Sequence, residues 1–171
     1  MTPPVLVSLS GLPGAGKTTL ARALCARLGA MHLRIDSIEH ALRAIGQGDG
    51  PAGYLAAYAV AEDNLRLGHP VVADCVNPLA ITRQAWRDAA ARAGARIVEV
   101  EVVCSDPGEH RRRVEDRAPD WPGQRLPAWA DMQARVIEKW DRAPVRIDTA
   151  GRSLDTCVAQ ALAALCLAAL E

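Results

Sequence analysis

The sequence has no net charge and no paired cysteine motif. Lysine and arginine number 20 and are matched by 20 aspartate and glutamate residues, so the chain lacks the broad positive surface that nucleic acids or anionic membranes attract. Its five cysteines form no C-x-x-C pair, and their number is odd, which argues against a disulfide framework or a zinc site. We expect all five to be small buried side chains in a reducing compartment.

Long apolar segments and repeats are also missing. The most apolar segment, residues 154–170, is interrupted by Asp155, Thr156 and Gln160 and is too short to cross a bilayer comfortably. The N-terminal sequence has neither the basic nor the long apolar region of a signal peptide. No linker divides the 171 residues, so we expect one soluble cytoplasmic domain, residues 1–171. The apolar last segment fits either a buried helix or a dimer contact, and monomer and homodimer both stay open.

A glycine-rich motif is the clearest positive signal. The sequence GLPGAGKTT matches G-x-x-x-x-G-K-[ST] and comprises Gly11, Leu12, Pro13, Gly14, Ala15, Gly16, Lys17, Thr18 and Thr19. An apolar run precedes it and an amphipathic stretch follows it, which is the strand–loop–helix context of a phosphate-binding loop (P-loop). Glycines let successive backbone N–H groups point into one concavity, and the helix N-terminus adds its partial positive charge.

The motif also supplies the side chains that a nucleotide with magnesium needs. Lys17 can reach the β- and γ-phosphate oxygens as a mobile point charge. The hydroxyl of Thr18 can bind a magnesium ion. The motif therefore predicts that the chain binds ATP or a similar nucleoside triphosphate together with Mg²⁺.

Apolar β-type runs alternate with helical patterns along the whole chain. We predict strands over residues 5–10, 31–35, 70–74, 96–103 and 145–147, several of them apolar without alternation, as strands buried on both faces are. Helices are predicted over 17–28, 37–44, 54–68, 80–93, 107–117, 127–140 and 154–170. This alternation predicts an α/β doubly wound sheet.

Residues 117–130, RAPDWPGQRLPAWA, break this rhythm. Three prolines, at 119, 122 and 127, exclude a continuous helix. The segment follows an arginine-rich helix, which is where a mobile lid would lie. Alternatively, its tryptophans pack a long loop onto the core.

Acidic side chains end two of the predicted strands. Asp36 follows the second strand, where ligands bind an open α/β sheet, so it can accept the proton of an acceptor hydroxyl, or it can cap the next helix. Asp74 ends the third strand as the metal-binding aspartate of a Walker B element does, although any buried strand can end in Asp. Asn77 in the turn that follows can contact substrate or cap a helix.

Two further segments can face a nucleotide. Arg113 and Arg117 are four residues apart, so we expect them on one helical face, either neutralising a transferring phosphoryl group or paired with Glu109, Glu115 and Asp116. The DTAG sequence at 148–151 resembles a GTPase switch, but it follows the last strand and no N-K-x-D motif accompanies it. We interpret it as the turn into the final helix, beside the nucleotide base.

Together these segments resemble a known family. GLPGAGKTT, LRIDS, VVADCVNPLAITRQAW, VCSDPGEHRRRVEDR and VRIDT are similar to P-loop kinases of the AAA_33 type, a group that overlaps with the polynucleotide 5′-kinase domain, zeta toxins, gluconate kinase and chloramphenicol phosphotransferase. The resemblance covers nearly the whole chain. It implies a P-loop NTPase three-layer sandwich with a five-stranded parallel sheet in the order 2-3-1-4-5 and a short lid over about residues 113–130.

The resemblance also assigns roles. It implies that Asp36 is the base for the acceptor hydroxyl, that Asp74 to Asn77 are the family's D-x-x-N segment, that Arg113 and Arg117 are the lid pair, and that Thr149 to Gly151 form the adenine-side loop. With Thr18 from the motif, Asp74 is expected to hold magnesium directly or through water. Many relatives carry an arginine three or four residues after the strand-two aspartate, where this chain has Glu39 and His40 and the next arginine is Arg43. That departure argues against acidic or phosphorylated acceptors. Asn77, Arg43 and Tyr54 are the candidate acceptor-binding residues.

The sequence therefore predicts an ATP-dependent kinase that phosphorylates a hydroxyl group of a small molecule, with Asp36, Lys17, Arg113 and Arg117 as its catalytic residues. One alternative is a polynucleotide or nucleoside 5′-hydroxyl kinase, which the neutral net charge disfavours. The other is an ATP-binding regulatory or toxin-like module with little turnover. Neither a nucleic acid nor a membrane is an expected partner.

Overall fold

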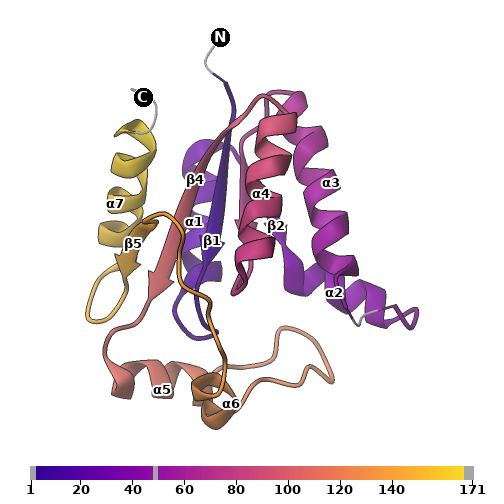
Figure 1. Cartoon of the computed structure of the whole chain (residues 1–171). Helices are drawn as coiled ribbons and strands as arrows, with labels where there is room; N and C mark the ends of the chain where they lie inside the picture. The colour runs from indigo at the N-terminus through magenta and orange to yellow at the C-terminus, as the bar shows by residue number, and fades with distance from the viewer. Residues whose placement is uncertain (1–2, 48–49, 168–171) are drawn as a thin grey trace.

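A five-stranded parallel sheet forms the centre of the computed structural model, which describes residues 3–47 and 50–167 (Figure 1). Its strands are β1 Val5–Ser10, β2 Met31–Arg34, β3 Val71–Asp74, β4 Arg96–Val103 and β5 Val145–Asp148. They lie in the order β2-β3-β1-β4-β5. The predicted fold class and strand order are confirmed.

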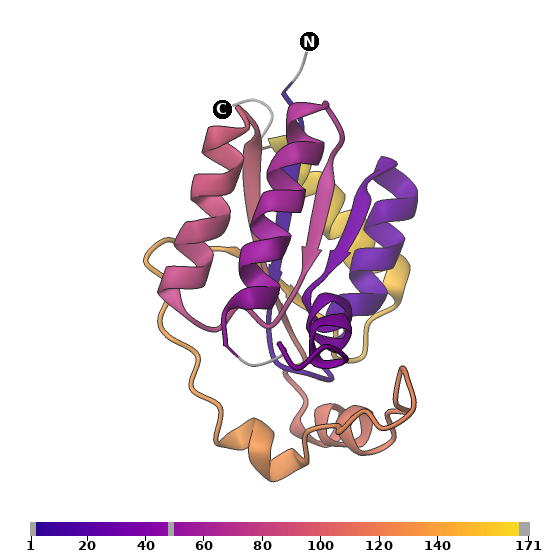
Figure 2. The same cartoon turned by 90° about the vertical axis from the view of Figure 1, so that its right-hand side faces the viewer.

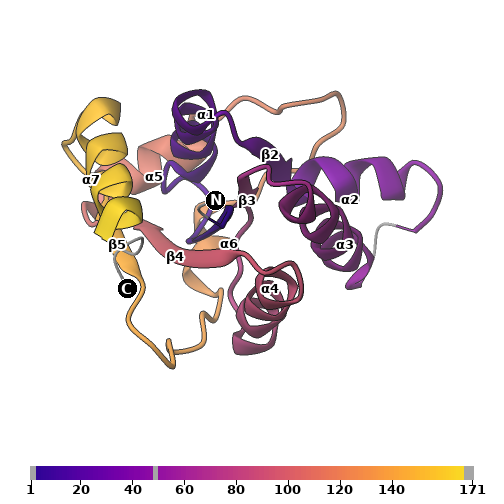
Figure 3. The ribbon, with the colours of Figure 1, turned by 90° about the horizontal axis from the view of Figure 1, so that it is seen from above.

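Helices cover both faces of the sheet and make the three-layer sandwich (Figure 3). Helices α1 Lys17–Leu28 and α7 Leu154–Leu167 pack on one face with Leu20, Leu24 and Val158. Helices α3 Ala52–Arg66 and α4 Ala80–Arg92 pack on the other face around Tyr58 and Trp86. Every residue of β1 is buried, which explains why that strand is apolar without alternation.

The carboxyl ends of the strands point to one end of the molecule, and the remaining elements gather there (Figure 2). Helix α2 Ile35–Arg43 follows β2 directly, while α5 Pro107–Glu115 and the short α6 Trp129–Gln133 lie beyond the end of the sheet. The register places Arg34 of β2 opposite Asp74 of β3. This end of the sheet therefore collects the polar side chains on which the sequence analysis focused.

The helix predicted over 127–140 is wrong in its length. Helix α6 ends at Gln133, and the chain then runs without helix to β5. The side chain of Arg83, fully buried on α4, donates to the carbonyl oxygens of Glu138 and Lys139 at 3.1 and 2.9 Å. The backbone N–H of Glu138 donates to the Pro78 carbonyl at 2.9 Å. These hydrogen bonds to residues far away in the sequence occupy the backbone groups that would otherwise form the hydrogen bonds of a helix.

The prediction that Arg113 and Arg117 share one helical face is also wrong. Helix α5 ends at Glu115, so Arg117 lies in the loop beyond it. Pro119 explains the early end, because a proline disfavours helical backbone at the residue before it and cannot continue the helix. The two arginines consequently point to different partners, as described below.

Three smaller expectations have mixed outcomes. The last helix is described only to Leu167, so its predicted end at residue 170 lies outside the described residues. All five cysteines are free, but Cys166 is exposed and Cys25 is half-buried, so the prediction that all are buried is wrong for these two. Among the described residues, no helix has the length and apolarity needed to cross a membrane.

Candidate active site

A pocket of about 1640 Å³ opens at the carboxyl end of the sheet. The P-loop borders one side, α2 and α3 border another, and the segment from Arg117 to Pro127 borders a third. A pocket for one small ligand usually measures about 300–1,000 Å³. This pocket therefore has room for two ligands side by side, one of them against the P-loop.

The P-loop leaves β1 and turns into α1 as the motif requires. Gly14 and Gly16 have φ values of +79° and +97°, which side chains rarely tolerate. Pro13, Gly14, Gly16, Lys17, Thr18 and Thr19 line the large pocket. Gly11, Leu12 and Ala15 border instead a smaller cavity of about 200 Å³ beside β4. The loop thus presents most of its residues from Pro13 onward to the pocket, while Gly11, Leu12 and Ala15 face the sheet side.

Replacing Gly11 by alanine should destabilise the chain by about 3 kcal/mol or more. A Cβ atom at Gly11 would lie 2.1 Å from the Val102 carbonyl oxygen, at a φ of +138°. Gly29→Ala is the matched control, because its φ is +60° but nothing lies within 4 Å, so it should cost only about 1 kcal/mol. Urea unfolding of both variants measures the difference. Equal losses would contradict the close approach of the loop to β4.

Lys17 begins α1 and is buried inside the pocket wall. Its ammonium group donates to the Leu12 carbonyl at 2.9 Å, which holds it across the loop. Burial lowers the pKa of Lys17 to about 8, although the charges of Asp74 and Asp36 act in the opposite direction. A phosphate group entering beside it would find a partly desolvated cation whose charge it can compensate.

Thr18 and Asp74 form the part of the site that suits magnesium. Burial alone would raise the pKa of Asp74, but hydrogen bonds from His32 and Thr18 and the charge of Lys17 outweigh it, so its pKa lies below the usual value. No group of three His, Cys, Asp or Glu able to hold a metal exists among residues 3–47 and 50–167. Mg²⁺ in nucleotide sites needs only one or two protein oxygens together with phosphate oxygens and water. One hydroxyl and one ionised carboxylate at the P-loop fit that requirement.

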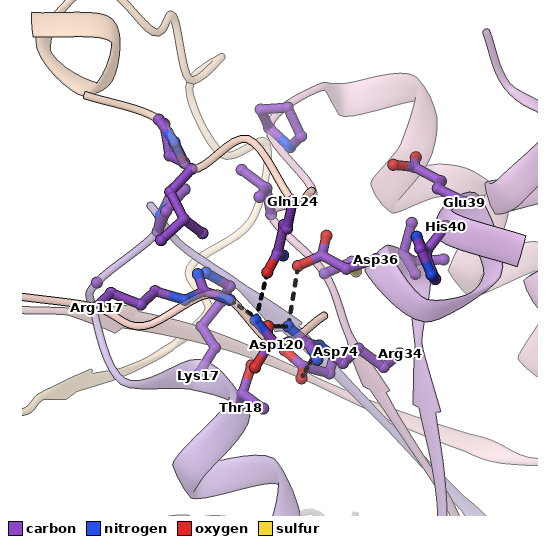
Figure 4. Close-up of a pocket in the computed structure, with 18 of the residues that line it drawn as sticks. Lys17, Thr18, Arg34, Asp36, Glu39, His40, Asp74, Arg117, Asp120 and Gln124 are labelled. Atoms are coloured by element: carbon purple, nitrogen blue, oxygen red, sulfur yellow. Dashed lines mark hydrogen bonds and ion pairs between the residues drawn. The ribbon is translucent and has the colours of Figure 1, made fainter. Parts of the chain in front are cut away.

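Asp36 lies in the first turn of α2 and reaches into the pocket (Figure 4). Its side chain is 47% exposed, and its Oδ2 accepts a hydrogen bond from Arg34 Nη2 at 3.3 Å. Helix α2 begins at Ile35 and has no side-chain cap, so the alternative that Asp36 caps the helix does not hold. The carboxylate therefore lies at the pocket wall, partly exposed and paired with Arg34.

Arg34 is a site residue that the sequence analysis missed. It ends β2, its side chain is 8% exposed, and its Nε lies 3.9 Å from Asp74 Oδ2. One guanidinium therefore bridges Asp36 and Asp74. Its signal in the sequence is a charged residue between the apolar residues Leu33 and Ile35, two positions before Asp36. Arg34 thus supplies a positive charge beside Asp36, where many relatives have an arginine three or four residues after the aspartate.

The segment after α5 borders the pocket and contributes a second residue that the sequence analysis missed, Asp120. Asp120 Oδ2 accepts hydrogen bonds from Arg34 Nη2 at 2.6 Å and from Arg117 Nη2 at 2.7 Å. The neighbouring Trp121 stacks on His40 of α2, with ring centroids 4.2 Å apart. Trp121 therefore packs this loop onto α2 and not onto the hydrophobic core, while Arg117 and Asp120 line the pocket.

Arg113 points toward Thr149, in the turn that follows β5, rather than toward Asp36. Its Nη1 donates to Thr149 Oγ1 at 2.7 Å, and its Nη2 pairs with Glu109 at 2.5 Å. The Thr149 hydroxyl in turn donates to the Ala15 carbonyl at 2.9 Å. Arg113 thus ties α5 to the P-loop through Thr149, and both residues line the pocket.

The candidate acceptor residues separate into two groups. Arg43 and Tyr54 line the pocket, with the Arg43 guanidinium paired to Glu39 at 3.1 Å. Asn77 is fully buried and does not line it. Its backbone N–H donates to Tyr54 Oη at 3.1 Å and its Nδ2 to Ser8 Oγ at 3.3 Å, so it supports the pocket floor. It does not cap α4, which begins three residues later at Ala80.

A P-loop that opens from the central strand of a β2-β3-β1-β4-β5 sheet defines the class of P-loop NTPase folds. The AAA_33 family, described as an AAA domain, matches residues 6–139, and the chain belongs to this family. No curated protein matches the sequence.

Solved structures share the fold over nearly the whole chain. The APS kinase CysC of Mycobacterium tuberculosis, in complex with AMPPNP and APS, is 22% identical with a TM-score of 0.72, covering 96% of this chain and 99% of that one. A gluconokinase from Sinorhizobium meliloti 1021 is 20% identical with a TM-score of 0.68, covering 98% and 94%. The tunicamycin resistance protein of Deinococcus radiodurans is 16% identical with a TM-score of 0.64, covering 95% of each. At these identities the likeness is one of fold.

Proposed function

We propose that this protein is an ATP-dependent kinase that transfers the γ-phosphoryl group to a hydroxyl group of a small molecule. The observation that carries the proposal is the placement of Asp36 and the P-loop on one pocket large enough for two ligands. A carboxylate available for proton transfer, facing a phosphate-binding loop, is the arrangement that phosphoryl transfer to an alcohol requires. The AAA_33 family membership and the kinases among the similar folds support the same reading.

The residues divide the work as follows. The P-loop backbone and Lys17 bind the phosphates of ATP, and Arg113 and Thr149, which are joined to the P-loop at Ala15, border the nucleotide from beside the loop. Asp36 orients the acceptor hydroxyl and takes its proton as the oxygen attacks. A new P–O bond to the acceptor forms while the bond from the γ-phosphorus to the bridging oxygen of ADP breaks. Positioning and charge stabilisation supply most of the rate.

Thr18 and Asp74 would hold the magnesium ion that accompanies the nucleotide. Bound there, Mg²⁺ neutralises charge on the β- and γ-phosphates. The low pKa of Asp74 keeps its carboxylate ionised for this role.

The acceptor half of the pocket is lined by both apolar and charged groups. Leu55, Leu79 and Ile81 are exposed at 61%, 40% and 74% and all border it. Glu39, His40 and Arg43 border it from α2. The acceptor we expect is a compact hydroxyl compound with some apolar surface.

The test is ADP release from Mg-ATP across a panel of hydroxyl-bearing acceptors, with mass spectrometry of the products. The panel includes sugars, nucleosides, aminoglycosides, phenicols and a 5′-hydroxyl oligonucleotide. One small acceptor that raises turnover and gains 80 Da, the mass of a phosphoryl group in place of hydrogen, would support the proposal. Stimulation by the oligonucleotide alone, falling steeply with salt, would favour the polynucleotide kinase instead. Tight ATP binding with no stimulation would favour the regulatory module.

A further inference from the structure

Arg34 lies in the pocket between Asp74 and Asp36. The proposed function places the nucleotide at the P-loop and the acceptor hydroxyl beside Asp36, so the phosphoryl group would be transferred close to this guanidinium. Arg34 bridges these two carboxylates, with its Nη2 3.3 Å from Asp36 Oδ2 and its Nε 3.9 Å from Asp74 Oδ2. Its Nε makes no hydrogen bond to any described residue, so one donor of this buried guanidinium stays unused.

The Asp120 carboxylate contacts the Arg34 guanidinium in the structure. Its Oδ2 accepts from both Arg34 and Arg117, and Figure 4 shows it between the two arginines. Gln124 Oε1 accepts from the Asp120 backbone N–H at 2.5 Å, which fixes the turn that presents the carboxylate. A single oxygen held by two arginines reproduces the way in which a phosphate oxygen is bound.

Among the described residues, Asp120 is the carboxylate that pairs with both arginines. Arg34 also pairs with Asp36 and lies 3.9 Å from Asp74. Withdrawal of Asp120 leaves Arg117 without this partner and Arg34 with its longer contacts, so an anionic group can take the place of the carboxylate.

We propose that Arg34 and Arg117 form the clamp for the terminal phosphoryl group of the nucleotide, and that Asp120 fills this clamp in the ligand-free chain as an internal competitor. Arg34 is then a catalytic residue, because it contacts the phosphoryl group in transit as the P–O bond to ADP breaks and the bond to the acceptor forms. Asp120 leaves the clamp when the triphosphate enters. This inference rests on the proposed function, but its test needs no acceptor.

The test compares the binding of AMPPNP and ADP to Asp120→Asn by calorimetry. Removing the competitor should tighten AMPPNP binding about 10-fold and change ADP binding by less than about twofold, because AMPPNP carries a γ-phosphate and ADP does not. Asp116→Asn is the matched control. It removes the same charge from an exposed position four residues earlier, and Asp116 makes no ion pair among the described residues.

Three outcomes would overturn the clamp. One is an AMPPNP affinity of Asp120→Asn that differs from that of Asp116→Asn by less than twofold. Another is an equal gain for AMPPNP and ADP. The third is unchanged nucleotide binding with a lowered KM for the acceptor, which would assign the clamp to an anionic group of the acceptor.

A second variant tests Arg34 itself. Because Arg34 holds Asp120, the effect of Asp120→Asn on AMPPNP binding should fall below about threefold in an Arg34→Gln background whose folding is verified by thermal unfolding. A full 10-fold gain in that background would overturn the role of Arg34. If Asp120→Asn changes the ratio of the AMPPNP and ADP affinities but no acceptor is phosphorylated, the clamp stands and the kinase proposal fails. If transfer depends on Asp36 but this affinity ratio is unchanged, the kinase proposal stands and the clamp fails.

Discussion

Replacing Asp36 by asparagine should lower acceptor phosphorylation by about 10²- to 10⁴-fold, the usual contribution of a general base. Asparagine keeps the shape of the side chain and can still accept the hydrogen bond from Arg34 at this position. It cannot take a proton from the acceptor hydroxyl. Because Asp36 lies on the acceptor side of the pocket, the affinity for AMPPNP should change by less than about threefold.

The measurement is kcat/KM for the acceptor found in the panel, with AMPPNP binding determined on the same samples. Asp63→Asn is the matched control, because it makes the same substitution on α3 at a side chain that is 78% exposed. Retained turnover in Asp36→Asn would exclude Asp36 as the base. A parallel loss of AMPPNP affinity would show instead that Asp36 shapes the pocket.

The fold could be predicted because its signals are local. The apolar run of β1 lacks alternation because the strand is buried on both faces, and the glycine motif marks where it ends. The non-helical course of residues 134–142 could not be predicted in this way. It depends on the Arg83 side chain, which is 55 and 56 residues away from the carbonyl groups that it binds. A pattern read along the sequence does not contain such contacts.

The same reasoning explains which contacts of the candidate site could be predicted. Lys17, Thr18 and Thr149 all line the pocket, and the first two belong to a contiguous motif whose geometry is fixed by its own backbone. Asp120 stands alone between prolines, and its partner Arg34 lies 86 residues earlier. The helix boundary before Arg117 was signalled by Pro119, but the direction in which Arg117 points depends on Asp120. Roles that arise from pairing across the pocket become visible only in three dimensions.

Replacing Lys17 by methionine should weaken AMPPNP binding about 100-fold and, at neutral pH, stabilise the ligand-free chain by about 2 kcal/mol. The first effect follows from the loss of charge-assisted hydrogen bonds to phosphate. The second follows from burial, which lowers the pKa of Lys17 from 10.5 to about 8. That difference corresponds to about 3 kcal/mol of unfavourable charge burial, from which the lost hydrogen bond to Leu12 subtracts about 1 kcal/mol.

The pH dependence separates this explanation from simple repacking. Below pH 8 the lysine is protonated in both states, and the full cost of burying its charge is present. Between pH 8 and 10.5 the folded chain loses the proton first, so the unfolded state binds more protons and the wild-type chain gains stability as the pH rises. The advantage of Lys17→Met should therefore be largest below pH 8 and shrink toward pH 10.5.

Urea unfolding across this pH range measures the advantage, and AMPPNP-dependent thermal shifts measure binding. Lys139→Met is the matched control, since Lys139 is the other lysine of the chain and is exposed outside the pocket. A stability difference that does not change with pH would remove charge burial as its cause. An undiminished thermal shift in Lys17→Met would contradict the assignment of Lys17 to the phosphates. Stabilisation combined with lost binding is the expected result. Burial makes the charge of Lys17 unfavourable in the free chain, and the same burial strengthens its electrostatic attraction to the phosphates of a bound triphosphate.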